Sequence, residues 1–443
     1  LQRIWGFIMA NVYISVLGTN DYLPCNYYAN ETRVVENVRF VQEATVLYRC
    51  SGWSSDDRIL IFTTDEAYKK NWLDNGQTDR HGRVLERKGL KRCLDAIGTS
   101  ATIQNVPIPE GRDQDEIWAI FMSIFSRLDR GDRVVFDITH SFRSIPMLVM
   151  IVVHYAKTLK KVTLGSIDYG ALEALGSIEA VRAMDVKDRN VPIFDLTPFD
   201  RLLDWTLAID RFLGTGDARA AAELARTEIS LGSSGNVGEV AEKMLEFTMN
   251  IATCRGRSLS ESAMALKQAV RDCEANDARP AFKDLMHVLQ QGLDDFRGDE
   301  VSDGIASARW CLRHNLIQQG LTILQETLVS HLATSAGLDP HDRSVREIGP
   351  GSVVCVNKDE KDWTGKSAQC VEITRQYIET LRETPNLRKL FKKPWNKLKA
   401  YRNDVDHAGY TQNPKGAREF EAALQDAIEK AAALIKENSS DSP

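Results

Sequence analysis

The chain has 443 residues, of which 43% are hydrophobic and 27% are charged, and its formal net charge is −6 at pH 7. This composition is typical of a soluble protein with two or three domains, and the acidic balance means that any contact with nucleic acid is expected to be local. Eight cysteines without a C-x-x-C pair or zinc-like Cys/His spacing favour a reducing cytoplasm and no metal site. No apolar run reaches the length of a membrane span.

Strands and helices are predicted to alternate in the first half of the chain. Near-continuous apolar runs that end in polar turns are typical of buried parallel strands, and amphipathic patterns between them predict helices. This alternation predicts a doubly wound α/β domain with a mainly parallel sheet. Pro192 places a last extended segment, 191–197, near a sheet edge. The strands are expected at 11–17, 58–62, 101–106, 133–138 and 162–167, and the helices at 34–49, 84–97, 113–128 and 144–159.

In such a sheet, ligands bind beyond the C-terminal ends of the strands. Three polar turns fall there, at 18–22, 63–65 and 139–144. The third is the richest, because it leads from a strand into a helix N-terminus, where free amides and the helix dipole favour an anion. His140 is expected to be structural. The groups in this turn that could hold phosphates or riboses belong to Thr139, Ser141, Arg143 and Ser144.

Three familiar nucleotide and hydrolase motifs do not occur. The first turn reads Gly-Thr-Asn-Asp-Tyr from Gly18 to Tyr22, which is not the dinucleotide fingerprint G-x-G-x-x-G. The chain also contains no G-x-x-x-x-G-K-[ST] loop and no G-x-S-x-G elbow. ATP hydrolysis through a P-loop is therefore not expected.

The second half of the chain is predicted to be helical throughout. A helix is expected at 198–213, and alanine, glutamate, leucine and arginine then dominate 217–292, so a domain boundary is predicted near 195–216. A long amphipathic pattern at 305–332 has a break at Arg313-His314. Residues 336–366 are expected to be an irregular loop. Further helices are predicted at 369–384, from Pro394 onward, and at 416–436.

The strongest candidate for chemistry is the sequence Tyr-Arg-Asn-Asp-Val-Asp-His-Ala-Gly at 401–409. On a helix, Arg402 and His407 would lie about 140° apart, close enough to border one cleft, especially against a second copy of the helix. Asn403, one turn before His407, could orient the imidazole. A histidine exchanges protons and an arginine holds a phosphate, so the pair suggests metal-free phosphodiester cleavage. The alternative is a solvated basic helix with an incidental histidine.

Basic residues gather just before this motif. Seven of them occupy the fifteen positions that end at Arg402, with no acid among them. They are Arg388, Lys389, Lys392, Lys393, Lys397, Lys399 and Arg402.

Two motifs in distant parts of the chain resemble signatures that occur together in one family. Residues 137–144, Asp-Ile-Thr-His-Ser-Phe-Arg-Ser, resemble the D-x-T-H-G-x-R-S motif of CARF domains, which are CRISPR-associated Rossmann-fold sensors. Ser141 stands where that family usually has glycine. Residues 402–407 resemble the R-N-x-x-x-H motif of HEPN ribonucleases. The order resembles that of the CARF–HEPN accessory ribonucleases of type III CRISPR systems, as do the turn at 17–22 and the segment 191–199.

The resemblance implies a domain order and a ligand. A Rossmann-like CARF domain is expected at 9–197, a helical linker region at 198–300 and an all-α HEPN domain at 301–437. Members are homodimers, with or without higher assembly, whose paired CARF domains bind a cyclic oligoadenylate. Cyclic tetra-adenylate is favoured over cyclic hexa-adenylate, and no other cofactor is implied. The expected ligand residues are Gly18, Thr19, Asn20, Thr139, Ser141, Arg143 and Ser144.

The resemblance also implies a reaction on single-stranded RNA. The 2′-hydroxyl attacks the neighbouring phosphate without metal and leaves a 2′,3′-cyclic phosphate. Arg402 would stabilise the phosphate charge, His407 would transfer the proton, and Asn403 would position the group. The basic stretch 388–399 would attract the RNA backbone, with Lys392, Lys393, Lys397 and Lys399 as the binding residues. Phe391, Trp395 or Tyr401 would either stack on bases or belong to the core.

Two alternatives stay open at this point. One is a ligand-sensing regulator without nuclease activity, whose helical half binds DNA or a protein partner; a helix-turn-helix would favour it, and no convincing one is recognised in the sequence. The other is a sensor that also degrades its own activator in the CARF pocket.

Overall fold

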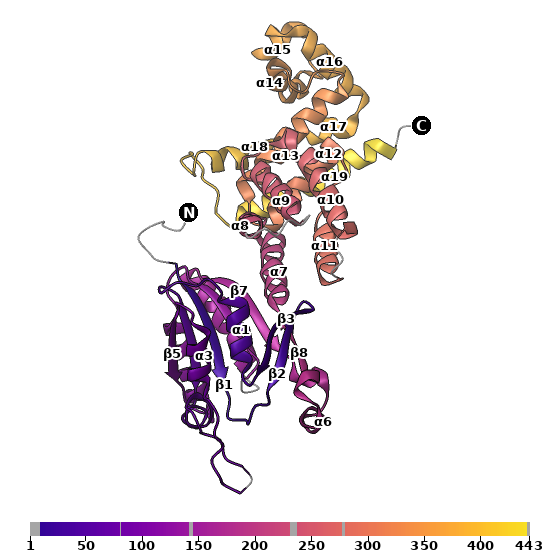
Figure 1. Ribbon diagram of the computed structural model, residues 1–443. Helices are drawn as coiled ribbons and strands as arrows, with labels where there is room; N and C mark the ends of the chain where they lie inside the picture. Colours follow the sequence, from indigo (N-terminus) through magenta and orange to yellow (C-terminus); the bar gives the residue numbers. More distant parts are fainter. Residues whose placement is uncertain (1–8, 80, 141–144, 231–236, 277–279, 441–443) are drawn as a thin grey trace. The chain divides into compact units, whose positions relative to one another are not determined.

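The computed structural model describes residues 9–79, 81–140, 145–230, 237–276 and 280–440 (Figure 1). They belong to two compact units, Leu1–Arg201 and Leu202–Pro443. The boundary falls within one helix, α7 (Thr197–Thr215). The finer division into a sensor, a linker region and a nuclease domain stays a prediction.

An eight-stranded sheet in the order β3-β2-β8-β7-β6-β1-β4-β5 forms the first unit. Five neighbouring strands, from β7 to β5, run parallel, β8 is antiparallel to β7, and β2 and β3 form an antiparallel hairpin. The predicted Rossmann-like fold with a mainly parallel sheet is confirmed. The strands are β1 (Asn11–Leu17), β2 (Cys25–Ala29), β3 (Thr32–Val38), β4 (Arg58–Thr63), β5 (Thr102–Pro107), β6 (Arg133–Asp137), β7 (Thr163–Gly170) and β8 (Asn190–Asp195).

Helices cover both faces of this sheet. Val12, Ile14 and Val16 of β1 pack with residues of α4 and α5, whereas Tyr13 and Leu17 pack on the opposite face with residues of α1 and α3. Side chains of a strand alternate between faces, so a strand that is apolar on both sides is buried between two helical layers. The helical segments are α1 (Val41–Arg49), α2 (Asp65–Ala67), the π-helix η1 (Tyr68–Trp72), α3 (Leu90–Ile97), α4 (Gln114–Ser126), α5 (Ile145–Lys160), η2 (Leu172–Leu175), α6 (Ile178–Ala183) and η3 (Val186–Asp188).

Three predictions for the first unit are wrong. The helix expected at 84–97 begins only at Leu90, and Val84 forms an isolated antiparallel β-bridge with Thr78. The helix expected at 34–49 begins only at Val41, because the preceding residues form β3 and pair with β2. The segment around Pro192 is not near an edge, since β8 lies between β2 and β7. A proline loses only its N–H in a sheet, and the Pro192 carbonyl still accepts a hydrogen bond from the Ala171 N–H at 3.0 Å.

The described residues of the second unit form helices joined by turns and loops, without a β-strand among them, as predicted. One of its cores gathers around Phe212, Phe247 and Trp310, and another around Leu324 and Tyr377. The break expected near Arg313 is present, but the loop expected at 336–366 contains a ten-residue helix, α14. No described helix is long and apolar enough to cross a membrane. The helical segments are α8 (Arg219–Ser230), α9 (Val237–Ala252), α10 (Gly256–Asn276), α11 (Pro280–Gly292), α12 (Glu300–Arg313), α13 (Ile317–Ser335), α14 (Arg343–Ser352), η4 (Val353–Cys355), η5 (Glu360–Asp362), α15 (Lys366–Gln369), α16 (Val371–Glu383), α17 (Pro385–Leu390), α18 (Lys393–Asp406) and α19 (Glu419–Ser440).

Candidate functional site

A buried carboxylate holds the turn that follows β6. Asp137 is 1% exposed and accepts hydrogen bonds from the backbone N–H of Thr139 at 3.0 Å and from its hydroxyl at 2.6 Å. The hydroxyls of Tyr13 and Ser15 on β1 donate to its other oxygen. Burial raises the pKa of the Asp137 carboxyl. Thr139 Oγ1 also accepts from the Gly170 N–H at 2.8 Å, so this turn is tied to both neighbouring strands.

The turn that follows β1 is held by two buried amide side chains. Asn71 donates to the carbonyl oxygens of Gly18 at 2.8 Å and Asn20 at 2.9 Å. Gln77 donates to those of Thr19 and Asn20, both at 3.3 Å. These bonds occupy the carbonyl groups of the turn and fix its backbone without a ligand.

A cavity of about 490 Å³ lies against both turns. Ligand pockets for small molecules have volumes of about 300–1,000 Å³, so the cavity has the size of a binding site. Of the expected ligand residues, Asn20 and Thr139 line it, whereas Gly18 and Thr19 belong to the supporting turn. Ser141, Arg143 and Ser144 lie outside the described residues. Further lining residues include Asp21, Tyr22, Arg39, His140, Tyr169, Gly170 and Arg182.

His140 and Tyr22 form one wall of this cavity. Their rings stack with centroids 4.1 Å apart and planes 26° from parallel. Burial lowers the pKa of His140 to about 4. The imidazole is therefore neutral at neutral pH, and its Nε2 is buried without a hydrogen-bond partner among the described residues. The predicted structural role and a ligand contact are both compatible with this position.

Arg39 is one of the lining residues that the sequence analysis did not assign to a ligand. Its Nε and Nη1 are buried and have no hydrogen-bond partner in the described part of the chain. The guanidinium carbon lies 4.4 Å from the centroid of the Phe40 ring. Burial and the nearby Arg87 lower the pKa of Arg39, yet a guanidinium stays charged in proteins. Partial burial of a cation without a partner costs free energy. Hydrogen bonds from the guanidinium to an anionic ligand in the cavity would offset this cost.

The second candidate site is at the C-terminal end of α18. Arg402 and Asn403 lie in its last turns, and His407 is the capping residue that follows, with its backbone N–H 3.1 Å from the Asn403 carbonyl oxygen. His407 and Asn403 are exposed. Arg402 Nε lies 2.8 Å from Asp406 Oδ2 in an ion pair without hydrogen-bond geometry, and both side chains are about a third exposed. The side chains of Arg402 and His407 are thus both accessible to solvent at the end of α18.

A buried aspartate fixes the chain after this helix. Asp404 is 4% exposed and accepts from the Thr411 hydroxyl at 2.6 Å and from the Lys415 N–H at 3.0 Å. Ala408 adopts a left-handed conformation with φ of 51°, which turns the chain directly after His407. Asp404 therefore fixes the backbone of the motif, while the side chains of Asn403 and His407 remain accessible to solvent.

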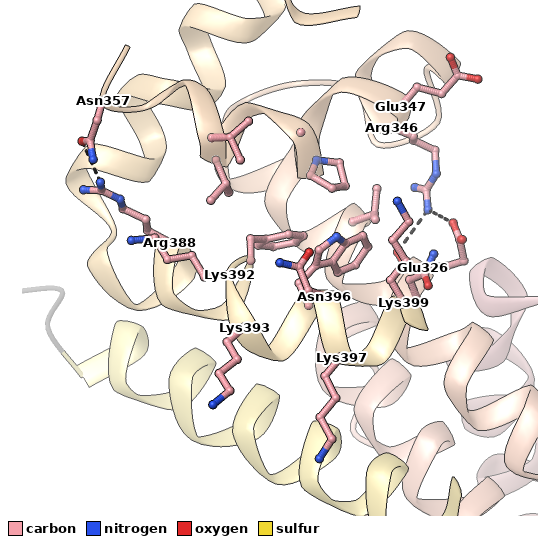
Figure 2. A pocket seen from close by; sticks show the side chains of 18 residues that line it. Glu326, Arg346, Glu347, Asn357, Arg388, Lys392, Lys393, Asn396, Lys397 and Lys399 are labelled. Atoms are coloured by element: carbon pink, nitrogen blue, oxygen red, sulfur yellow. Dashed lines mark hydrogen bonds and ion pairs between the residues drawn. The ribbon is translucent and has the colours of Figure 1, made fainter. Parts of the chain in front are cut away.

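The four lysines that were expected to bind RNA line a groove of about 1310 Å³. Figure 2 shows this groove with Arg388, the first residue of the basic stretch 388–399, and with Arg346, which the sequence analysis did not assign to it. Phe391 and Trp395 are 2% and 6% exposed and pack with ring centroids 5.0 Å apart. Of the two roles considered for these rings, the structure therefore supports the core.

Comparison with known proteins relates the first unit to a known domain family. Residues 12–169 match the family described as "CRISPR system endoribonuclease Csx1, CARF domain". The CRISPR-associated protein MJ1674 of Methanocaldococcus jannaschii is 26% identical over 277 residues, which cover 61% of this chain and 40% of that protein. The chain thus spans less than half the length of this relative. The family match ends at residue 169, before the second unit begins.

Proposed function

We propose that this chain, which is a CARF-containing accessory protein of a type III CRISPR system, is an endoribonuclease that a cyclic oligoadenylate activates. The observation that carries the nuclease part is the sequence at 402–407, which presents Arg402, Asn403 and His407 at the exposed end of a basic helix. The activator would bind the cavity between the two turns of the CARF domain. Its phosphates would meet Arg39, and its riboses would meet Asn20 and Thr139.

In the proposed reaction, the 2′-hydroxyl of the RNA attacks the adjacent phosphate, and the bond to the 5′-oxygen of the next nucleotide breaks. The products are a 2′,3′-cyclic phosphate and a 5′-hydroxyl. One group must take the proton of the attacking hydroxyl and another must protonate the leaving oxygen. His407 exchanges these protons, and Arg402 neutralises charge on the phosphate as it develops. Since one exposed imidazole supplies only one of the two roles at a time, two copies of the chain complete the site.

An apolar surface on the first unit supports pairing with a second copy. Large side chains on α5 at four-residue spacing, together with two on α4, are each between 44% and 69% exposed. Exposed apolar patches of this kind are rare in monomers and mark interaction surfaces. The surface consists of Trp118, Met122, Met147, Ile151, Tyr155 and Leu159.

The test is cleavage of labelled single-stranded RNA with and without cyclic tetra-adenylate or cyclic hexa-adenylate, in EDTA. The native protein is expected to cut only with one of the rings, and to leave 2′,3′-cyclic phosphate ends. Arg402→Ala and His407→Ala should each lower the rate by about a hundredfold or more, because proton transfer and charge stabilisation contribute this much. His341→Ala, which changes an exposed histidine outside the motif, is the matched control.

The outcomes separate the parts of the proposal. Undiminished cleavage by His407→Ala would rule out this active site. Activity that disappears in EDTA and returns with Mg²⁺ or Mn²⁺ would contradict the metal-free reaction. Ring binding without any cleavage by the native protein would favour the regulator without nuclease activity.

A further inference from the structure

The groove in Figure 2 concentrates positive charge in a chain that is acidic overall. Residues of α13 and α14 line one part of it, and residues of α17 and α18 line another. Six of its lining side chains are cationic and two, Glu326 and Glu347, are anionic. The cations are Arg346, Arg388, Lys392, Lys393, Lys397 and Lys399.

Some of these charges already have partners. Arg346 Nη2 lies 2.6 Å from Glu326 Oε2, and Lys397 Nζ lies 2.9 Å from Oδ2 of Asp426 on α19. Figure 2 shows Lys393 and Lys397 extending from the same side of α18 toward α19, away from Arg346 and Arg388. These contacts leave a smaller set of cations that can hold a ligand in the groove.

Four cations of the groove have no ion-pair partner in the part of the chain that the structure describes, and three of them, Arg388, Lys392 and Lys399, do not extend toward α19 as Lys393 does. Lys392 and Lys399 are exposed, and their ammonium groups face no carboxylate within ion-pair distance. Arg388 donates to the neutral Asn357 side-chain oxygen at 2.9 Å, and its Nε is buried without a hydrogen-bond partner among the described residues. A guanidinium held by a neutral amide keeps its full charge for an anion in the groove.

These cations lead toward the Arg402–His407 motif. Lys392, Asn396, Lys399 and Asn403 follow one another at spacings of four, three and four residues, which places them on one face of α18. At 1.5 Å per residue, this face is about 16 Å long from Lys392 to Asn403. Asn403 directly follows Arg402, so a strand that runs along this face would reach the proposed reaction centre.

We propose that the groove binds the sugar-phosphate backbone of single-stranded RNA next to the Arg402–His407 motif, through Arg388, Lys392 and Lys399. The inference rests on the proposed nuclease function and names its substrate-binding track. The three cations lie in a row rather than around one point, which suits successive phosphates better than a single phosphate group. Phe391 and Trp395 do not stack on the bases, because their rings are buried.

The experiment measures binding in the absence of cleavage. Fluorescence anisotropy follows a labelled oligouridylate of about 12 residues, a length within the range of single-strand sites, at several KCl concentrations with the His407→Ala protein. Each phosphate contact on a single strand contributes about 0.7 to the slope of log K against log salt, which corresponds to a factor of about 5 in affinity at about 0.1 M salt. Lys392→Gln/Lys399→Gln in this background removes two such contacts and should therefore weaken binding about 25-fold. Adding Arg388→Gln should bring the loss to about a hundredfold.

The control changes the same number of charges elsewhere in the unit. Lys243→Gln/Arg271→Gln alters α9 and α10 outside the groove, and should leave the affinity and the salt slope unchanged. Lys392 and Lys399 are exposed, so their replacement should not alter the thermal unfolding of the protein.

An affinity and a salt slope equal to those of the control would overturn the groove proposal, even if the native protein cleaves RNA. Tighter binding of poly-glutamate than of RNA through the same lysines would overturn it in favour of an acidic protein partner. Salt-dependent RNA binding that the lysine changes weaken, without cleavage by the native protein, would sustain the groove and reject the nuclease. The two proposals can therefore fail separately.

Discussion

Replacing Arg39 by methionine tests whether this residue receives an anion or supports the fold. The change removes the guanidinium and keeps an unbranched stem that can still cover Phe40. In the unliganded protein, Arg39 Nε and Nη1 are buried without hydrogen-bond partners among the described residues. A structural arginine would have such partners, so the two roles predict opposite effects on stability.

The expected magnitudes follow from these contacts. Loss of the cation–π contact with Phe40 costs about 0.5–1 kcal/mol. Removal of buried N–H groups without partners offsets this, since each costs about 1–3 kcal/mol. The free energy of unfolding of Arg39→Met should therefore stay unchanged or rise. Bonds from the guanidinium to a ligand phosphate are worth about 1.5–3 kcal/mol each, so the Kd of cyclic tetra-adenylate should increase about a hundredfold.

Calorimetric titration with cyclic tetra-adenylate and urea unfolding measure the two quantities on the same protein. Arg33→Met is the matched control, because Arg33 on β3 is exposed and pairs with Glu36 outside the cavity. Its ring affinity should equal that of the native protein. Unchanged ring affinity in Arg39→Met would refute the argument, and so would a loss of several kcal/mol in unfolding free energy, which would make Arg39 structural.

Two further predictions concern the first unit. The pKa of His140 is about 4 when folded and 6.5 when unfolded, so the unfolded chain binds more protons in this window and stability falls as the pH drops through it. Between about pH 7 and 5 the native protein should lose up to about 2 kcal/mol more unfolding free energy than His140→Phe, and equal losses in urea titrations would reject the buried neutral imidazole. Ile151, on α5, is 54% exposed, and Ile151→Glu should yield a folded monomer that no longer cleaves RNA. The control Leu47→Glu on α1 should remain a dimer in sedimentation. If Ile151→Glu is also a dimer, α5 is not the interface.

Among the strands that the sequence predicted, β1, β4 and β6 are largely buried, whereas β5 at the edge of the sheet has one buried residue. β1 and β4 are apolar nearly throughout, so their pattern does not depend on which neighbour they have. β2 and β3 pair at the side of the sheet, and β3 has no fully buried residue. The predicted helix at 34–49 therefore included most of β3 together with α1, and the hairpin was not predicted. Arg39 was overlooked for the same reason, because it follows this hairpin directly.

Composition misled the prediction for 336–366. Gly349, Pro350 and Gly351 are typical of a loop, yet all three lie within α14. A Cβ on Gly349 would lie 2.9 Å from the Tyr377 ring, so the glycine allows α14 to pack closely on α16. Close packing of this kind outweighs local helix propensity, and nothing in the local sequence reveals it.

The two candidate sites differ in how complete they are in one chain. Around the ligand cavity, buried Asp137, Asn71 and Gln77 fix both turns before any ligand arrives. At the end of α18, by contrast, the proposed reactive residue His407 is exposed and Arg402 is paired with Asp406. A ligand can only shift an equilibrium between states that it binds differently. If the ligand cavity is rigid and the reaction centre is incomplete, regulation acts on the pairing of two chains at α18 rather than on the chemistry within one.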